Sequence, residues 1–495
     1  MAMMTKAASK YKDIISKRRE KKKGSPTIYQ LGLTKENIGT LKRRSLGVKN
    51  PNKIVEDEKK DQSQSQTSDV VVYEIFGLED KTLPYSLTII DTPGFGCTEE
   101  IEHDEIVSQR LFDLFRSVGG VHEINAVGLV LKATENRLSD RLSYILNSVL
   151  SLFGKDLEQN IIALLTHSTG RVPYNALDAL DAAKIKCARN DRNQPVHFLF
   201  DSCQNDPRTE DDTGLEDAYN KAMHEMERFI TLLQNYAPQK LETTVDVLNE
   251  RIRLTACIQN LQERIQCMEL KQKEIQQTQE ALKQNEERMK KSLEVSTIEV
   301  DEPYKDKEPI KSGMWGLFFY EGAVTCNVCE ENCHYPGCTM SHNPSHCEVM
   351  KGGRCTSCTN KCPVADHVKE GYRYVTKTRK VKKTLEDVKK KYEENKAQNE
   401  KSLDILESLE KEMETLEALK TKTLYEAYDH VVRLDQIALS VVSVSTYVHL
   451  DFLIEEMEKK GDTKNAQKLK EMSGRKNKRD IAAIKYLYRK YFSSK

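Results

Sequence analysis

Several features that would place this 495-residue chain in a common class are scarce or missing. Lysine plus arginine and aspartate plus glutamate each number 77, so the net charge of zero gives no general attraction to nucleic acid or to a membrane surface. Hydrophobic residues make up only 38% and charged residues reach 31%. This composition argues against one large core and favours a globular domain joined to long solvated helices.

Long apolar runs are also missing. No run approaches the ~18 residues that a membrane-spanning helix needs. The basic start MAMMTKAASKYKDIISKRREKKK has none of the apolar character of a signal peptide. We therefore expect no transmembrane segment and no secretion. A cytoplasmic location with reduced thiols is the prediction that follows.

The first half of the chain predicts an α/β domain after a basic, polar segment and linker over residues 1–69. Strand-like runs rich in β-branched and aromatic residues alternate, in their later part, with helical stretches, and near-continuous apolar strands of this kind are typical of a parallel sheet covered on both faces. The domain is expected over residues 70–235. The strands are expected at 70–77, 85–91, 124–131, 160–166 and 196–200, and the helices at 140–153, 177–190 and 214–235.

The second half predicts long helices. Apolar residues recur in steps of three and four over residues 241–300 and again over 376–425, which is the spacing of a coiled coil. Residues 426–495 look helical and end in a basic tail. An antiparallel hairpin carrying a cysteine-rich module at its tip is the economical arrangement, but two parallel coiled coils made by dimerisation fit equally well. We expect protein partners or self-association through these helices.

Thirteen cysteines are present, and eight of them crowd between Cys326 and Cys362. Without a secretory signal, such crowding indicates metal binding before disulfides. The cluster contains the same ligand spacing twice, with histidine at the last position of the second unit. The first unit is Cys326, Cys329, Cys333 and Cys338, and the second is Cys355, Cys358, Cys362 and His367.

Each unit offers four ligands, so the sequence predicts two structural zinc ions in the module over residues 314–370. The units could bind separately or exchange ligand pairs in a cross-braced site. Spare ligands that could replace a fourth ligand are His334, His342, His346 and Cys347. Between Cys326 and His367, three basic residues face four acidic ones, so nucleic acid is an unlikely partner.

A second motif lies in the α/β domain. Asp91, Thr92, Pro93 and Gly94 follow an apolar strand and precede Phe95-Gly96. Here the sequence resembles the P-loop GTPases, in the septin and immunity-associated branches. The resemblance implies that Asp91 lies near magnesium, that Gly94 meets the γ-phosphate, and that Thr166 and His167 stand where the family reads guanine.

Three departures from that family argue against GTP and magnesium as cofactors. No GxxxxGK[ST] exists, because no two of the 22 glycines are five residues apart. His167 and Thr169 replace the lysine and aspartate that would read guanine. The region before Val70 is too short and polar for the first strand, phosphate loop and helix. Because that strand is central in the family, another segment must fill its place, and residues 27–33 are the candidate.

Three functions remain open from the sequence. The first is a GTPase-like protein of impaired turnover that acts as a scaffold through its helices and zinc module. The second is an active GTP-binding and GTP-hydrolysing protein of the septin or immunity-associated type. The third is a zinc-dependent nucleic-acid binder. The missing phosphate loop favours the first, because phosphoryl transfer depends on positioning and charge neutralisation by that loop.

Overall fold

The structure of the chain is a computed structural model, and it forms two compact units. The sheet unit comprises Met1–Asn249, Arg433–Asp451 and Gln467–Lys495. The ribbon unit comprises Glu250–Val432 and Phe452–Ala466. The described residues are 2–7, 29–30, 41–45, 70–75, 86–92, 101–117, 119–134, 139–200, 213–289, 297–310, 314–315, 319–320, 322–338, 343–384, 405–441 and 443–474.

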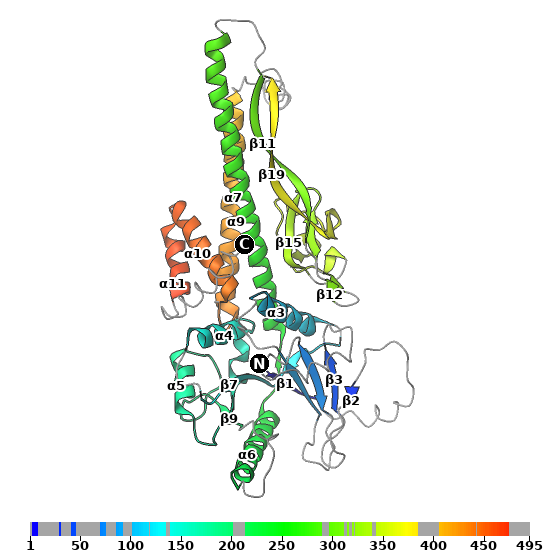
Figure 1. The fold of residues 1–495 in the computed structure, drawn as a ribbon, viewed down its shortest axis with the longest axis vertical. Coiled ribbons are helices and arrows are strands. Elements are labelled where there is room, and N and C mark those ends of the chain that lie inside the picture. Colours follow the sequence, from blue (N-terminus) through cyan, green and yellow to red (C-terminus); the bar gives the residue numbers. More distant parts are fainter. Residues whose placement is uncertain are drawn as a thin grey trace, which may run out of the picture. The chain divides into compact units, whose positions relative to one another are not determined.

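The sheet unit contains an eight-stranded mixed sheet in the order β2-β3-β4-β5-β1-β7-β8-β9 (Figure 1). Strands β7, β8 and β9 are parallel, as predicted, whereas every other neighbouring pair is antiparallel. The strands are β1 Ala2–Ala7, β2 Tyr29–Gln30, β3 Leu41–Ser45, β4 Val71–Ile75, β5 Ser86–Asp91, β7 Ala126–Lys132, β8 Ile161–Thr166 and β9 His197–Leu199.

The N-terminal region corrects two predictions. Residues 1–69 are not only a linker, because three strands of the sheet lie within them. The segment between β5 and β7 is β1, not residues 27–33, and it is antiparallel to both neighbours. Tyr29–Gln30 instead forms the edge strand β2. Strand β1 thus supplies the backbone partners that a central gap would have left unpaired.

Apolar side chains explain why β8 lies inside the sheet, between β7 and β9. Ile162 and Leu164 belong to a buried cluster that includes Phe229 and Leu233 of α6 (Thr213–Asn235), and the ring of Phe229 meets Phe198 edge-on at 5.2 Å. The alternate residues of β8 are buried as well. Because neighbouring strand residues point to opposite faces, both faces of this strand are covered. The prediction of a two-sided apolar strand is confirmed here.

The remaining helices of the sheet unit are α3 (Ile101–Arg116), α4 (Asp140–Leu150) and α5 (Tyr174–Ala182). Ser139 begins α4, since its Oγ accepts a hydrogen bond from the Leu142 N–H at 3.1 Å. Helix α5 ends eight residues before the predicted helix does. The short strands β6 (Glu123–Ile124) and β10 (Gln239–Lys240) pair beside the main sheet.

Chain segments from the C-terminal third also belong to the sheet unit. The backbone of Leu439 donates to the Phe153 carbonyl at 2.9 Å, and Gly154 forms a bridge with Ala438. The Gly154 N–H donates to Thr244 Oγ1 at 3.1 Å. A Cβ atom at Gly154 would come within 2.7 Å of the Thr243 methyl group, so this approach requires glycine.

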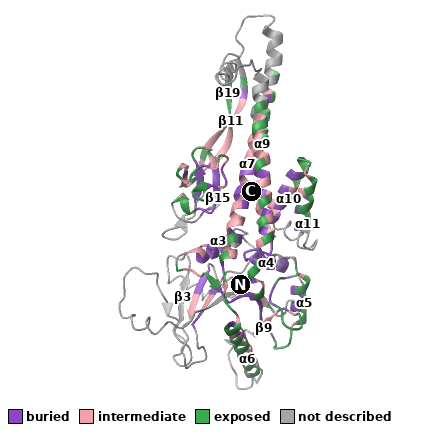
Figure 2. Cartoon of the chain, turned by 180° about the vertical axis from the view of Figure 1, so that it is seen from behind, coloured by how far each residue is buried: buried purple, intermediate pink, exposed green. Residues whose placement is uncertain are grey.

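The ribbon unit is organised by two long helices, α7 (Glu242–Met289) and α9 (Ile405–Ile437). Both opposite views draw them side by side (Figures 1 and 2). They meet at an ion pair in which His430 Nδ1 lies 2.6 Å from Glu250 Oε2. Helix α10 spans Val444–Lys459 and α11 spans Thr463–Gly474.

A strand ribbon replaces part of both predicted coiled coils. Strand β11 (Thr297–Pro309) pairs antiparallel with β19 (Tyr372–Thr384) over thirteen residues each. Helix α7 therefore ends before residue 300, and the predicted helix over 376–384 is a strand. The pairing is favoured by charge, because β11 is acidic and β19 is basic. Glu302 lies directly opposite Arg379 and binds it at 2.9 Å.

The Cys-rich segment lies along α7 rather than at the tip of a helical hairpin. It contains β12 (Met314–Trp315) with β13 (Phe319–Tyr320), β16 (Met350–Lys351) with β17 (Arg354–Cys355), and a sheet of β14 (Gly322–Cys326), β15 (Glu331–Cys338) and β18 (His367–Glu370). Buried residues gather around β15 (Figure 2). Among the described residues, none of the helices combines the length and apolar character needed to cross a bilayer.

The His430–Glu250 pair predicts a pH-dependent stability of the ribbon unit. Burial lowers the pKa of His430, but hydrogen bonds to Cys257 and Glu250 outweigh burial and raise the pKa to about 9. Protonated His430 therefore stabilises the fold fully below pH 6.5, the ordinary pKa, and this stabilisation is lost as pH rises through 9. The loss is at most about 3 kcal/mol at ~1.4 kcal/mol per pKa unit.

Urea unfolding at pH 6.5 and at pH 9 measures this effect. We expect His430→Gln to reduce the difference between the two free energies of unfolding. The variant Gln259→Glu, on the same helix as Glu250, is the control, because it also lowers the net charge by one but at a position away from the pair. Equal pH dependence in wild type and His430→Gln would contradict the prediction.

Candidate metal centre

Three groups of metal-ligating side chains lie in the Cys-rich segment, and within each group all ligand atoms are within 4.8 Å of one another. The described cysteines are free thiols. The first group is Cys326, Cys329, Cys358 and Cys362. The second is Cys333, Cys355, Cys358 and His367, and the third is His334, Cys338, Cys347 and Glu348.

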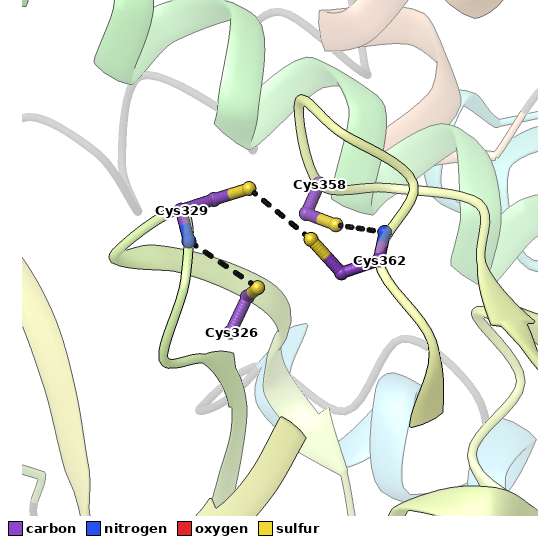
Figure 3. Close-up of side chains that lie close together, drawn as sticks. All are labelled: Cys326, Cys329, Cys358 and Cys362. Carbon is purple, nitrogen blue, oxygen red and sulfur yellow. Dashed lines mark hydrogen bonds between the residues drawn. The ribbon is translucent and has the colours of Figure 1, made fainter. Parts of the chain in front are cut away.

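The first group joins two loops that face each other (Figure 3). Cys326 ends β14 and Cys329 lies in the turn that follows, while Cys358 and Cys362 come from the loop after β17. The N–H of Cys329 points at Cys326 Sγ at 3.4 Å, and the N–H of Cys362 points at Cys358 Sγ at 3.2 Å. Backbone N–H groups aimed at sulfur favour the thiolate form that binds metal.

Left-handed backbone makes these turns tight. Glu330, which follows Cys329, has φ of 50°, and Lys361, which precedes Cys362, has φ of 47°. Such values are uncommon for residues other than glycine and cluster at functional sites. Each of the two loops thus contains one left-handed residue directly beside a cysteine of the first group.

The second group shares Cys358 with the first. Strand pairing explains the closeness of the two groups, because Cys326 of β14 lies directly opposite His367 of β18. The two groups therefore have seven different ligands between them, and two ions held there would be joined by the Cys358 thiolate.

A β-bulge decides where Cys333 goes. Asn332 pairs with Thr325 and His334 pairs with Val324, so Cys333 is the extra residue between them. A bulge redirects a side chain that regular strand alternation would point elsewhere. Cys333 therefore joins the second group, whereas His334 and Cys338 join the third.

Two observations show that these residues fit a metal ion. The Sγ atoms of Cys329 and Cys362 are 3.7 Å apart, close to the ~3.8 Å edge of a tetrahedron built with Zn–S bonds of ~2.3 Å. Among the described residues, the buried Nε2 of His367 has no hydrogen-bond partner, while its Nδ1 is 2.9 Å from the Pro363 carbonyl. A carbonyl on the far nitrogen is the usual support of a metal-binding histidine.

The pKa values of the thiols are shifted in opposite directions. Burial raises the pKa of Cys326 to about 11. Hydrogen bonds from Cys333 and Cys355 hold the pKa of Cys358 well below its usual range. A bound metal ion would remove the remaining protons, because thiolates are the ligating form.

The third group carries mixed charge. Burial lowers the pKa of His334, but the Cys338 thiolate and the Glu348 carboxylate raise it to about 10. His334 Nδ1 lies 3.2 Å from Cys347 Sγ and 3.0 Å from Glu348 Oε2. All four residues are buried.

Helix α7 holds the ligand loops by direct hydrogen bonds. Asn260 Nδ2 donates to Ser357 Oγ at 2.6 Å, and Arg264 Nη2 donates to Thr359 Oγ1 at 2.8 Å. Ala256 lies in the same buried cluster as the cysteines. On the other side, Lys361 Nζ binds Glu426 of α9 at 2.9 Å. The three groups of ligating side chains therefore pack together with α7 and α9.

The grouping differs from the two consecutive units that the sequence spacing favoured. The cross-braced alternative describes the first two groups better, and two spare ligands, His334 and Cys347, join Cys338 in the third. The exposed His346 belongs to none of the groups, and His342 lies outside the described residues. Sequence reasoning did not name Glu348, which carries no spacing signal.

The nucleotide-binding candidates lie at one edge of the sheet but do not meet. Asp91 ends β5, and Thr166 ends β8 with its Oγ1 donating to the Leu131 carbonyl at 3.2 Å. Three strand spacings separate β5 from β8, or roughly 14 Å. Thr92 is buried and His167 is exposed with φ of 51°, whereas Pro93 and Gly94 lie outside the described residues.

A cavity of about 720 Å³ opens near the end of β8. Ser168, Thr169 and Gly170 line it together with residues of α6, including Lys221. Asp91 is not among its lining residues. The cavity therefore does not unite the two nucleotide-binding motifs.

Searches of protein-family models, of curated proteins and of solved structures find no match to this chain. The assignment of its function therefore depends on the geometry of its own residues.

The shared position of Cys358 predicts an asymmetric effect of mutation. Cys358→Ser removes a ligand from both groups and should lower the bound metal by about two equivalents, whereas Cys329→Ser should lower it by about one, because each tetrahedral site needs four ligands. Metal analysis after dialysis against a chelator that wild type resists measures both. Cys267→Ser, on α7 but in none of the groups, is the matched control. Equal losses from Cys358→Ser and Cys329→Ser would refute a shared ligand.

Proposed function

We propose that this chain is an interaction scaffold, in which a GTPase-like α/β domain of impaired turnover is joined to a helical arm that structural zinc holds in shape. The observation that carries the proposal is the docking of the Cys-rich segment on α7 and α9, because the ligand loops themselves receive the hydrogen bonds of Asn260 and Arg264. Zinc bound to Cys326, Cys329, Cys333, Cys355, Cys358, Cys362 and His367 would fix those loops.

Zinc is the metal that the donor set favours. Thiolate and imidazole ligands in tetrahedral groups are typical of structural zinc sites, and four protein ligands leave no position for a catalytic water. Two zinc ions account for the first and second groups. Metal ligation contributes an apparent ~10–16 kcal/mol in zinc-finger peptides, enough to order a short segment with little core of its own.

The order of the strands supports a GTPase-like domain, and the direction of β1 supports its loss of turnover. In P-loop GTPases the phosphate loop follows the central strand at the edge where Asp91 would act. Here β1 is antiparallel to β5, with Ala2 opposite Asp91 and Ala7 opposite Ser86. The loop after β1 therefore leaves from the opposite edge, and no GxxxxGK[ST] is present to bind phosphate.

Protein partners, or a second copy of the chain bound through coiled coils, are the proposed targets of the arm. The long helices α7 and α9 supply extended surfaces for such contacts. An active GTPase is the second candidate, supported by Asp91 and Thr166 at the same edge of the sheet.

Nucleotide binding tests the first half of the proposal. We expect a fluorescent GTP analogue with magnesium to show no saturable binding, and GTP to be hydrolysed at the background rate, because no phosphate-binding loop neutralises the charge. Asp91→Asn should leave both readings unchanged. Magnesium-dependent saturable binding that Asp91→Asn weakens would establish the active GTPase instead.

Limited proteolysis of the full chain, with and without a strong zinc chelator, tests the second half. We expect chelation to expose residues 322–384 to cleavage, because the loops lose the ion that orders them, while the sheet unit keeps its protection. Readdition of zinc should restore protection. Metal analysis should confirm that the chelator has removed the zinc. If residues 322–384 then stay as protected as before, zinc has no structural role there.

A further inference from the structure

We propose that His334, Cys338, Cys347 and Glu348 form a third, separate zinc site, so that the chain binds three zinc ions. This inference deepens the proposed zinc-held scaffold and rests on it for the identity of the metal. The sequence spacing did not suggest this site. Cys338 was predicted as a ligand of the first unit, His334 and Cys347 were spare ligands, and no motif marks Glu348.

The site is built by two short segments. Strand β15 contributes His334 and Cys338, and the loop after the 3-10 turn Pro344–His346 contributes Cys347 and Glu348. Asn343 begins that turn, with its Oδ1 accepting a hydrogen bond from the Ser345 N–H at 3.0 Å, and the Cys347 N–H donates to the Pro344 carbonyl at 3.0 Å. These contacts fix the loop that presents the two ligands.

The four ligand atoms converge in a buried position. They lie within 4.8 Å of one another, and the residues are exposed by only 5% (His334), 2% (Cys338), 5% (Cys347) and 5% (Glu348). The distances from His334 Nδ1 to Cys347 Sγ, 3.2 Å, and to Glu348 Oε2, 3.0 Å, are a few tenths of an ångström shorter than the edges of a zinc tetrahedron. A small expansion of the loop would admit the ion.

Charge gives the reason for a cation. Glutamate is almost never buried unless it is paired, and buried charges are normally paired or bind metal. Metal binding would remove the thiol protons of Cys338 and Cys347, which leaves two thiolates and a carboxylate that a cation must neutralise. A divalent ion would do so, and two sulfur ligands favour zinc over magnesium or calcium.

The third site is connected to the helices by a chain of contacts. Arg253 Nε of α7 donates to the backbone carbonyl of Glu348 at 3.2 Å, and its Nη1 donates to Glu250 Oε1 at 2.9 Å. Glu250 in turn binds His430 of α9. An ion bound by Glu348 would therefore hold a loop that contacts α7 directly through Arg253. The same loop is linked to α9 indirectly, through Glu250 and His430.

Metal counting on the full chain tests the inference. We expect three zinc ions per wild-type chain and two per chain in His334→Ala and in Cys347→Ser. The matched control is His346→Ala, since His346 is exposed, adjoins Cys347 and belongs to none of the three groups. It should retain three ions.

The outcomes separate this inference from the proposal on which it rests. Two ions in wild type, unchanged in His334→Ala and Cys347→Ser, would overturn the third site and leave the scaffold proposal standing. No zinc in wild type would overturn both. If both variants failed to fold, the wild-type count would still decide, because three ions exceed what the other two groups hold.

For protein that carries three ions, hydrogen exchange gives a second readout. Removal of the third ion in Cys347→Ser should reduce the protection of residues 343–350 and leave that of residues 355–362 unchanged. Loss of protection in both segments would mean that the third group is not a separate site.

Discussion

The ribbon unit depends on the burial of many thiols, two imidazoles and a carboxylate within a segment that has little apolar core of its own. Such groups are costly to bury in charged form unless a cation accompanies them. The Sγ atoms of Cys329 and Cys362 are 3.7 Å apart, a distance that suits two ligands of one metal ion. The buried Nε2 of His367 could serve as a further ligand. On the proposed function, a metal ion would account for the way in which β14, β15, β18 and the loop after β17 converge.

The Cys-rich segment also makes direct contacts with the long helix α7. Asn260 and Arg264 bind the loop between Cys355 and Cys362, while Arg253 binds the loop that carries Glu348. Most helical stability in proteins comes from tertiary packing, and these contacts supply part of that packing for α7. On the proposed function, zinc acts on α7 through these contacts, and the arm is a metal-dependent element rather than a simple coiled coil.

The sheet unit illustrates a different constraint. A strand between β5 and β7 is needed to pair their backbone groups, and β1 meets that need in the antiparallel direction. The fold of the sheet is thereby completed without the element that grips phosphate in P-loop GTPases. Backbone N–H and C=O groups can pair with a neighbouring strand in either direction. A phosphate-binding loop, in contrast, must leave the strand at one particular edge of the sheet. On the proposed function, this difference explains how the sheet could be complete while nucleotide turnover is lost.

Local patterns sufficed for some of these features. The apolar runs at 160–166 and 124–131 identify β8 and β7, because two-sided burial leaves a continuous hydrophobic signature. The crowding of Cys326, Cys329, Cys355 and Cys358 identifies a segment whose side chains could bind a metal ion. The spacing of apolar residues from Leu254 onward identifies α7.

Other features were decided only in three dimensions. Val381 fits a heptad as well as a strand, and its partner Val300, on the acidic strand β11, lies some 80 residues away along the chain. The bulge at Cys333 separates ligands that are neighbours in spacing, and the shared Cys358 and the unmarked Glu348 have no signature along the chain. The sequence by itself determined which residue types are present and which segments bury apolar surface. Tertiary structure decided which ligands meet, because strand pairing and backbone direction bring together residues that local spacing cannot relate.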